Sequence, residues 1–113
     1  MKYMVLIGSQ ANGWDHLSED EQRALYGRIE TWWDEHASAG EILEGHQLQP
    51  AETATTVRVD RSGQASVTDG PFVEGKEVVS GYAEINVADL DEALRLARSW
   101  PGCPVVEIRP IAA

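Results

Sequence analysis

Two repeating patterns of hydrophobic and polar residues divide this chain into helices and strands. Between residues 19 and 38, large side chains recur three or four positions apart, which is the spacing of one face of an α-helix. Those side chains are Leu25, Ile29, Trp32 and His36, with Tyr26 and Trp33 widening the stripe. Ser18 and Glu21 form a capping box before it, and Gly40 is a typical stop after it. We therefore predict a helix over about 19–38.

A period of two marks the strands, and it is clearest over residues 78–87. One face of that strand carries Ala83, Ile85 and Val87, and the other carries Tyr82, Glu84 and Asn86. The apolar run 1–8 predicts a first strand, and 105–109 predicts a last one. A second helix is predicted between the capping pattern at 89–92 and the stop at 101–102.

The segment between the first helix and the strong strand is less regular. Ile42 and Leu43 open a short extended piece. Residues 55–59 are rich in β-branched side chains, which predicts a strand, and residues 61–63 have turn composition. Residues 64–68 are then expected to return as a second extended segment. A hairpin is the expected arrangement.

The resulting order is strand, helix, three strands, helix, strand, within a single domain spanning residues 1–113. It fits an α+β class with a ferredoxin-like (split β-α-β) antiparallel sheet and two helices on one face. A chain of this length has no third helix for the other face of the sheet. Homodimerisation through that face would bury it on both copies, so we expect a homodimer.

Composition narrows the classes of partner and setting. Nine basic and nineteen acidic residues give a formal net charge of -10, which disfavours nucleic-acid binding. Cys103 is the single cysteine, so no internal disulfide framework is possible and a reduced, cytoplasmic setting is expected. No run approaches the roughly 20 apolar residues of a membrane helix, so no membrane partner is expected.

Several segments in order resemble one protein family over nearly the whole chain. They are Ala39–Leu43, Leu48–Pro50, Ala54–Arg58, Val67–Glu77, Gly81–Tyr82, Asp91–Ala93 and Val106–Pro110. With Thr68–Phe72 (Thr-Asp-Gly-Pro-Phe) at their centre, they look like the DGPF branch of the YCII-related proteins. The resemblance implies a dimeric α/β barrel of the ferredoxin-like kind. It also implies small-molecule chemistry on cyclic or aromatic compounds for some members, and a sigma factor as a candidate partner for the DGPF branch.

Asp69 is the first candidate site residue. The resemblance implies an Asp and a His acting together, and Asp69 is the position that matches the aspartate. His46 is the candidate partner, since an imidazole beside a carboxylate can be poised for proton transfer. Two plainer interpretations stay open: Asp69 caps its own Asp-Gly-Pro turn, and His46 is an exposed loop residue.

A second set of residues could hold a substrate. Its members are Phe72, Glu74, Lys76, Tyr82 and Arg58. The charged members could equally form a solvated loop or, for Arg58 and Arg109, ordinary ion pairs. The rings could equally pack in the core or at a dimer interface.

The chain carries no phosphate loop, nucleophile elbow or dinucleotide fingerprint, so no cofactor is expected. No two histidines stand three or four residues apart, so no metal is expected either. His36, on the helical stripe, is expected to be a packed histidine. Two functions remain open: a cofactor-free lyase or isomerase with Asp69 as acid or base, and a non-catalytic ligand- or protein-binding module.

Overall fold

The computed structural model describes residues 1–10, 13–72, 75–102 and 104–112. Along these residues the chain forms a strand, a long helix and a second strand, then a two-stranded hairpin, and finally a strand, a short helix and a last strand. The elements are β1 (Lys2–Gln10), α1 (Glu19–Ser38), β2 (Ile42–Gln47), a 3-10 turn η1 (Ala51–Thr53), β3 (Thr55–Val59), β4 (Ala65–Asp69), β5 (Glu77–Asn86), α2 (Leu90–Arg98) and β6 (Val105–Pro110). Both predicted helices begin and end within a residue or two of their expected positions.

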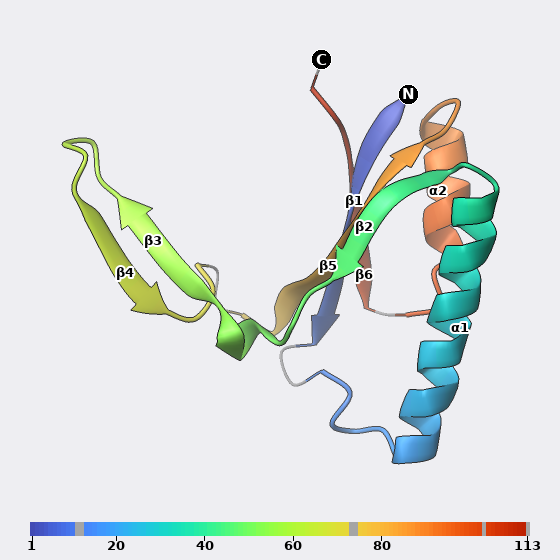
Figure 1. Ribbon diagram of the computed structural model, residues 1–113, viewed down its shortest axis with the longest axis horizontal. Coiled ribbons are helices and arrows are strands. Elements are labelled where there is room, and N and C mark those ends of the chain that lie inside the picture. Colours follow the sequence, from blue (N-terminus) through green and yellow to red (C-terminus); the bar gives the residue numbers. More distant parts are fainter. Residues whose placement is uncertain (11–12, 73–74, 103, 113) are drawn as a thin grey trace.

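The main sheet has four antiparallel strands in the order β2-β5-β1-β6. Val5 of β1 lies opposite Ala83 of β5 on one side and opposite Ile108 of β6 on the other. The two strands that each helix connects, β1 and β2 or β5 and β6, are therefore separated by one other strand, as two interleaved β-α-β units require. Both helices cover the same face of this sheet (Figure 1). The predicted α+β class, antiparallel sheet and two helices are confirmed.

The core lies between this covered face and the two helices. Alternate residues of β1 point into it, and they meet Trp32 of α1 together with Ala93 and Leu96 of α2. The full set is Tyr3, Val5, Ile7, Trp32, Ile42, Ala83, Ile85, Val87, Ala93 and Leu96. Trp32 joins the helices directly, because its Nε1 donates to the Ser99 hydroxyl at 2.8 Å and its ring packs edge-on against Trp100.

Both helices start as their sequences predict. The Glu21 backbone N–H donates to Ser18 Oγ, and the Ser18 backbone N–H donates to the Glu21 carboxylate, each at 3.1 Å. Those donors, the Ser18 backbone first, hold the pKa of Glu21 below its ordinary value. At α2, the Asp89 side chain accepts from the backbone N–H of Glu92 at 3.0 Å. Local hydrogen bonds thus fix where each helix begins.

The region around residues 42–69 differs from the sequence-based expectation in two ways. The short extended piece at Ile42–Leu43 is a full strand, β2, which forms one edge of the main sheet. Its Glu44–Gln47 part has low strand propensity, so pairing with β5 and not local preference makes it a strand. The expected hairpin is present, but it pairs only with itself and is not part of the main sheet.

We call this hairpin, residues 55–69, the arm. It projects from the sheet on the side opposite the helices (Figure 1). Its tip is ordered by Asp60, which accepts from the Ser62 hydroxyl and from the Gln64 backbone N–H, and these donors lower the pKa of Asp60. The radius of gyration is 16.1 Å, against about 13 Å for a compact domain of this size. The arm accounts for this extended shape.

The face of the main sheet that the helices leave uncovered is here called the open face. It carries the alternate residues of each strand, a mixture of apolar and charged side chains. They include Met4, Leu6, Glu44, His46, Tyr82, Glu84, Glu107 and Arg109. Within the described residues, no helix is long and apolar enough to span a membrane.

Candidate functional site

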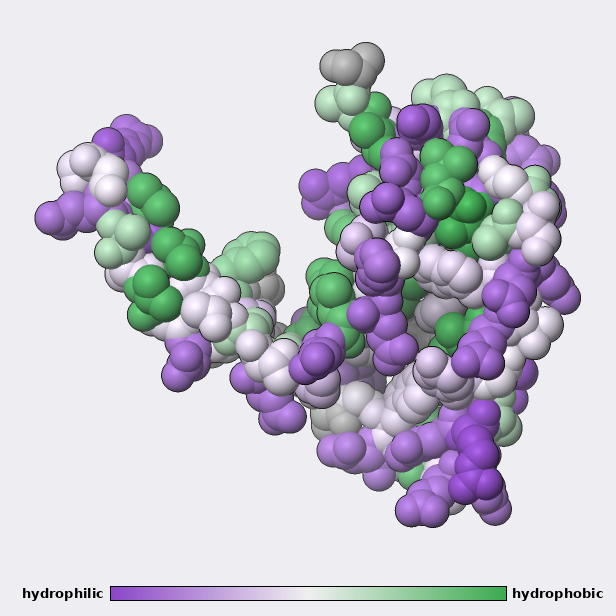
Figure 2. All heavy atoms as spheres, viewed as in Figure 1, coloured by the Kyte–Doolittle hydropathy of each residue, from purple (hydrophilic) through white to green (hydrophobic). Residues whose placement is uncertain are grey.

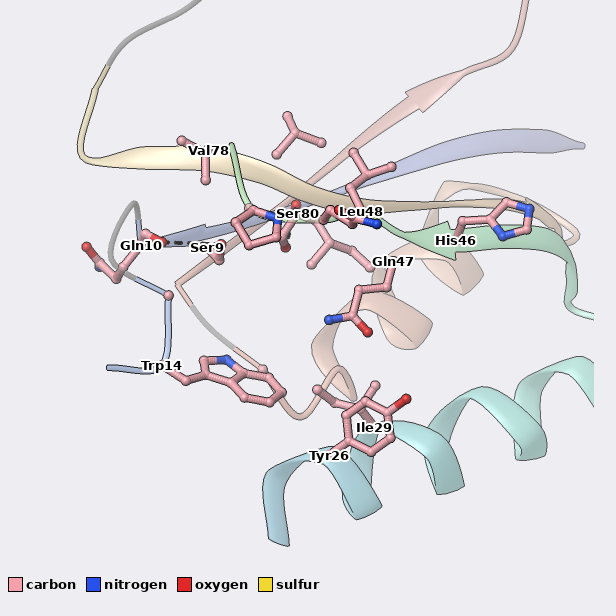
Figure 3. A pocket seen from close by; sticks show the side chains of 18 of the residues that line it. Ser9, Gln10, Trp14, Tyr26, Ile29, His46, Gln47, Leu48, Val78 and Ser80 are labelled. Carbon is pink, nitrogen blue, oxygen red and sulfur yellow. Dashed lines mark hydrogen bonds between the residues drawn. The ribbon is translucent and has the colours of Figure 1, made fainter. Parts of the chain in front are cut away.

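A cavity of about 980 Å³ lies between the first half of α1 and the end of the sheet formed by β1, β2 and β5. Aromatic and aliphatic side chains from several elements line it. They include Trp14, Tyr26, Ile29, Trp33, Val78 and Trp100. Figure 3 shows Trp14, Tyr26, Ile29 and Gln47 converging on this space from the loop, the helix and the strand. Residues as far apart in sequence as Trp14 and Trp100 thus meet around one hollow.

The loop before α1 is held beneath the helix by side-chain hydrogen bonds. Gln22 Nε2 donates to the carbonyl of Trp14 at 3.0 Å and to that of Leu17 at 3.3 Å. The Leu17 backbone N–H also donates to the Trp14 carbonyl at 2.8 Å. These bonds fix the backbone of Trp14, so its indole forms one wall of the cavity.

The wall on the β2 side is Trp33, which lies against the backbone of Gly45. A methyl group on Gly45 would come within 2.6 Å of Trp33 Cη2. Only glycine leaves room for the ring at this point, and the next residue on the cavity side, Gln47, points its amide into the hollow (Figure 3). Strand β2 therefore lets the Trp33 ring lie against its backbone at Gly45 and supplies the Gln47 amide to the cavity.

The polar lining consists of hydroxyls, amides and carboxylates. Its hydroxyl and amide members are Ser9, Gln10, Gln22, Gln47, Gln49 and Ser80. Its carboxylates are Asp15, Glu30, Asp34 and Glu52. None of these four pairs with a cation within the described residues, and no Lys or Arg of that part of the chain lines the cavity. The cavity thus combines aromatic walls with a negative rim.

Two of these carboxylates sit one helical turn apart. Glu30 and Asp34 are at positions i and i+4 of α1, where like charges repel. The indole Nε1 of Trp100 is buried and has no hydrogen-bond partner within the described residues. The cavity therefore offers an incoming molecule negative charge, aromatic faces and amide groups.

His46 borders the cavity, but its ring points away from the other labelled side chains (Figure 3). It lies opposite Tyr82 in the β2–β5 ladder on the open face. The two rings meet edge-on with centroids 5.9 Å apart. Two of the residues that the sequence singled out are thus brought together, on the open face.

Arg58 and Phe72 meet elsewhere, where the arm joins the body, and Asp69 stands nearby at the end of β4. Arg58 Nη2 donates to the Phe72 carbonyl at 3.3 Å, and Asp69 ends β4 opposite Thr55. Phe72 is 72% exposed. No hydrogen bond reaches the Asp69 carboxylate within the described residues, so the turn that follows is held by other groups.

Those groups are backbone and hydroxyl. Gly70 has φ +97°, which favours glycine, its N–H donates to the Ala54 carbonyl at 2.8 Å, and its carbonyl accepts from the Thr56 hydroxyl. We call residues 69–72 the arm root. None of them lines the cavity, and no hydrogen bond or ion pair joins Asp69 to His46.

The remaining candidates have simpler settings. Lys76 is exposed just before β5, and Glu74 lies outside the described residues. Arg109 pairs with Glu107 on the open face, the ordinary ion pair that was one of its two interpretations. His36 is half-buried, packs on Trp32 and bonds the Glu41 carboxylate at 2.8 Å. Within the described residues no group of three His, Cys, Asp or Glu side chains could hold a metal ion.

The cavity residues were not predicted as a site from the sequence. A signal was present in the first helix, because Tyr26 and Trp33 widen its apolar stripe beyond what one packing face needs. Tyr26 remains 45% exposed, and Trp33, which packs against the edge of the core, also borders the cavity beside Gly45. An amphipathic stripe that is too wide for its core is therefore the feature that points to this site.

The fold and cavity define a small α+β protein with an aromatic hollow between its long helix and its sheet. The model of the YCII-related domain matches residues 1–112. The chain is also 32% identical over 116 residues to an uncharacterized protein of Rhizobium meliloti (strain 1021), covering 99% of this chain and 93% of that protein. The chain belongs to the YCII-related family.

Proposed function

We propose that this protein binds a small molecule in the cavity between α1 and the sheet. The observation that carries the proposal is the cavity itself, about 980 Å³ with aromatic walls and a few polar groups. Binding sites for small molecules are typically hollows of roughly 300–1,000 Å³ with that kind of lining. The candidate cyclic or aromatic ligand expected from the sequence fits these walls.

The charge of the lining selects the ligand. Four unpaired carboxylates and the absence of lining cations, within the described residues, would repel an anionic group. The faces of Trp14 and Trp33 attract a cation, by about 0.5–2 kcal/mol for each well-placed ring. The proposed ligand is therefore an aromatic or cyclic compound that is neutral or carries an amine, and not a carboxylic acid.

A role for Asp69 as acid or base is a separate proposal. In one chain the arm root does not line the cavity, and His46 lies on the open face. Asp69 could therefore act on a ligand in the cavity only if a second copy of the chain brought it there. The proposed homodimer, with its sheets forming a dimeric α/β barrel, would supply such a copy. Assignment to the DGPF branch and partnership with a sigma factor stay predictions from the sequence.

The direct test is a thermal-shift comparison of three probes of similar shape. Benzyltrimethylammonium and benzyl alcohol should raise the melting temperature, since a ligand that binds only the folded state stabilises it. Phenylacetate should not. A larger shift with phenylacetate than with the ammonium probe would contradict the proposed ligand class.

Two matched variants locate the binding. Tyr26→Ala removes a cavity wall, and Phe72→Ala removes a more exposed ring at the arm root, outside the cavity. The shift should be lost in the first variant and kept in the second. Glu30→Gln should weaken the ammonium probe, whereas Glu35→Gln, on another face of the same helix, should not. Loss of the shift in Phe72→Ala alone would move the site to the arm root.

A further inference from the structure

One face of the arm is apolar and exposed. Val57 lies opposite Val67, and Val59 lies opposite Ala65, so all four side chains share one face of the hairpin. Val57, Val59 and Val67 are 57%, 66% and 65% exposed. We call these four residues the valine face. Figure 2 shows hydrophobic atoms running along the arm between its hydrophilic tip and the body.

The other face of the arm is different in kind. It carries Thr56, Arg58, Ser66 and Thr68. Apolar and polar residues alternate over 57–59 and 65–67, which is the pattern of a strand with one face buried, whereas Thr55 and Asp69 at the base of the valine side are polar. An isolated two-stranded hairpin is marginally stable in water, so this arm requires a surface on which its apolar face can pack.

The exposed area of the chain indicates how large that surface is. The chain exposes 8050 Å², whereas a compact monomer of its 12.4 kDa mass exposes about 6,100 Å². The excess, about 1,900 Å², exceeds the roughly 800 Å² that each partner buries in a standard interface. The chain therefore has area to spare for a stable dimer, and the arm and the open face supply it.

The direction of the arm places it beside such a partner. The arm leaves the sheet on the side away from the helices, which is the side of the open face (Figure 1). Two stacked sheets lie about 10 Å apart. Each strand of the arm has five residues, so the arm extends about 17 Å. An arm of that length reaches across the gap and onto a second copy stacked on the open face.

We propose that the arm is a clasp between two copies of this chain, with the valine face of each arm packed on the body of the other. Because such a dimer has two-fold symmetry, each arm contacts the body of the other copy, and the same contact occurs twice in the dimer. This inference rests on the homodimer proposed above and adds to it a defined contact. The arm root then has a structural task, because Gly70 and the Thr56 hydroxyl set the angle at which the arm leaves the body.

The test is the dimer dissociation constant of the full chain and two variants, measured by sedimentation velocity. Val67→Lys places a charge on the valine face, and Ser66→Lys places the same charge on the other face, one residue away. Wild type should sediment at twice 12.4 kDa. Val67→Lys should weaken the dimer at least about tenfold, since a buried charge costs several kcal/mol, and Ser66→Lys should leave it within about twofold.

Folding is checked independently of the arm. The four tryptophans lie at 14, 32, 33 and 100, outside the arm, so their fluorescence should be the same in all three proteins. A monomeric wild type would overturn both the homodimer and the clasp. A dimeric wild type with an unweakened Val67→Lys, or with both lysine variants weakened alike, would overturn the clasp and leave the homodimer in place.

Discussion

The indole ring of Trp33 lies directly against the backbone of Gly45. A methyl group at Gly45 would come within 2.6 Å of Trp33 Cη2 and closer still to the carbonyl oxygen of Tyr82. This contact joins α1 to β2 and sets one wall of the cavity. The shape of the proposed binding site therefore depends on one residue having no side chain.

Replacing Gly45 by alanine should destabilise the protein. The new methyl group meets backbone on one side and a bulky ring on the other, so the strand or Trp33 must move, at a cost of about 1–3 kcal/mol. Urea unfolding followed by circular dichroism measures this. Gly27→Ala in α1 is the matched control: nothing lies within 4 Å of its added methyl, and it should stabilise the helix by about 0.5–1 kcal/mol. Equal effects at the two glycines would contradict the proposed contact.

The bond from Trp32 to Ser99 should be worth a measurable part of the stability. Ser99→Ala leaves the indole N–H of buried Trp32 without its acceptor, at a cost of about 1–3 kcal/mol. Equilibrium unfolding in urea measures the loss. Ser66→Ala, at an exposed position of the arm, should change the free energy of unfolding by no more than about 0.5 kcal/mol. An unchanged free energy of unfolding in Ser99→Ala would mean that a water molecule takes the place of the hydroxyl as acceptor.

Stability should fall in acid partly through the cap of α1. The pKa of Glu21 in the folded chain lies below its ordinary 4.5, because it accepts from Ser18. Its contribution is therefore complete above 4.5 and is lost as the pH falls through the lowered value. In Glu21→Gln this part of the pH dependence should vanish, whereas Glu19→Gln should retain it. The test is to measure the melting temperature as a function of pH for the wild type and both variants. Identical curves for wild type and Glu21→Gln would contradict the capping role.

Dimer formation should strengthen with salt. Each copy carries a formal net charge of -10, so two copies repel at low ionic strength. Raising the salt from about 0.01 M to about 0.15 M shortens the screening length from roughly 30 Å to roughly 8 Å. Sedimentation at the two salt concentrations should show the lower dissociation constant in the higher salt. The opposite trend would indicate that ion pairs, and not apolar contact, hold the copies together.

Much of the fold was predictable because its signals are local. Ser18 and Glu21 satisfy each other within one turn of helix, and the alternation along β5 states which residues face the core. β2 was predicted only as a short extended piece, because its Gly45 and His46 become strand through pairing with β5. Nothing local says whether a hairpin joins the main sheet, so the separate position of the arm could not be predicted.

The candidate site was harder to predict for the same reason. The Asp69-Gly70 pair predicted a turn, and the positive φ of Gly70, +97°, is consistent with that turn. What the Asp69 carboxylate faces depends on how the arm is placed in space. The cavity arises from the angle between α1 and the sheet, and its lining is spread from Ile7 to Gly102. In the sequence, the cavity was indicated only by the wide hydrophobic stripe of the first helix, which Tyr26 and Trp33 extend.

The measurement that most directly tests the central claim is a titration of the protein with benzyltrimethylammonium, followed by the four indole N–H signals in an NMR spectrum. The signals of Trp14 and Trp33, which line the cavity, should shift with one saturating curve. The signal of Trp32, bonded to Ser99 and outside the lining, should stay in place. Shifts confined to backbone signals at Asp69–Phe72, with the indoles of Trp14 and Trp33 unmoved, would contradict the account.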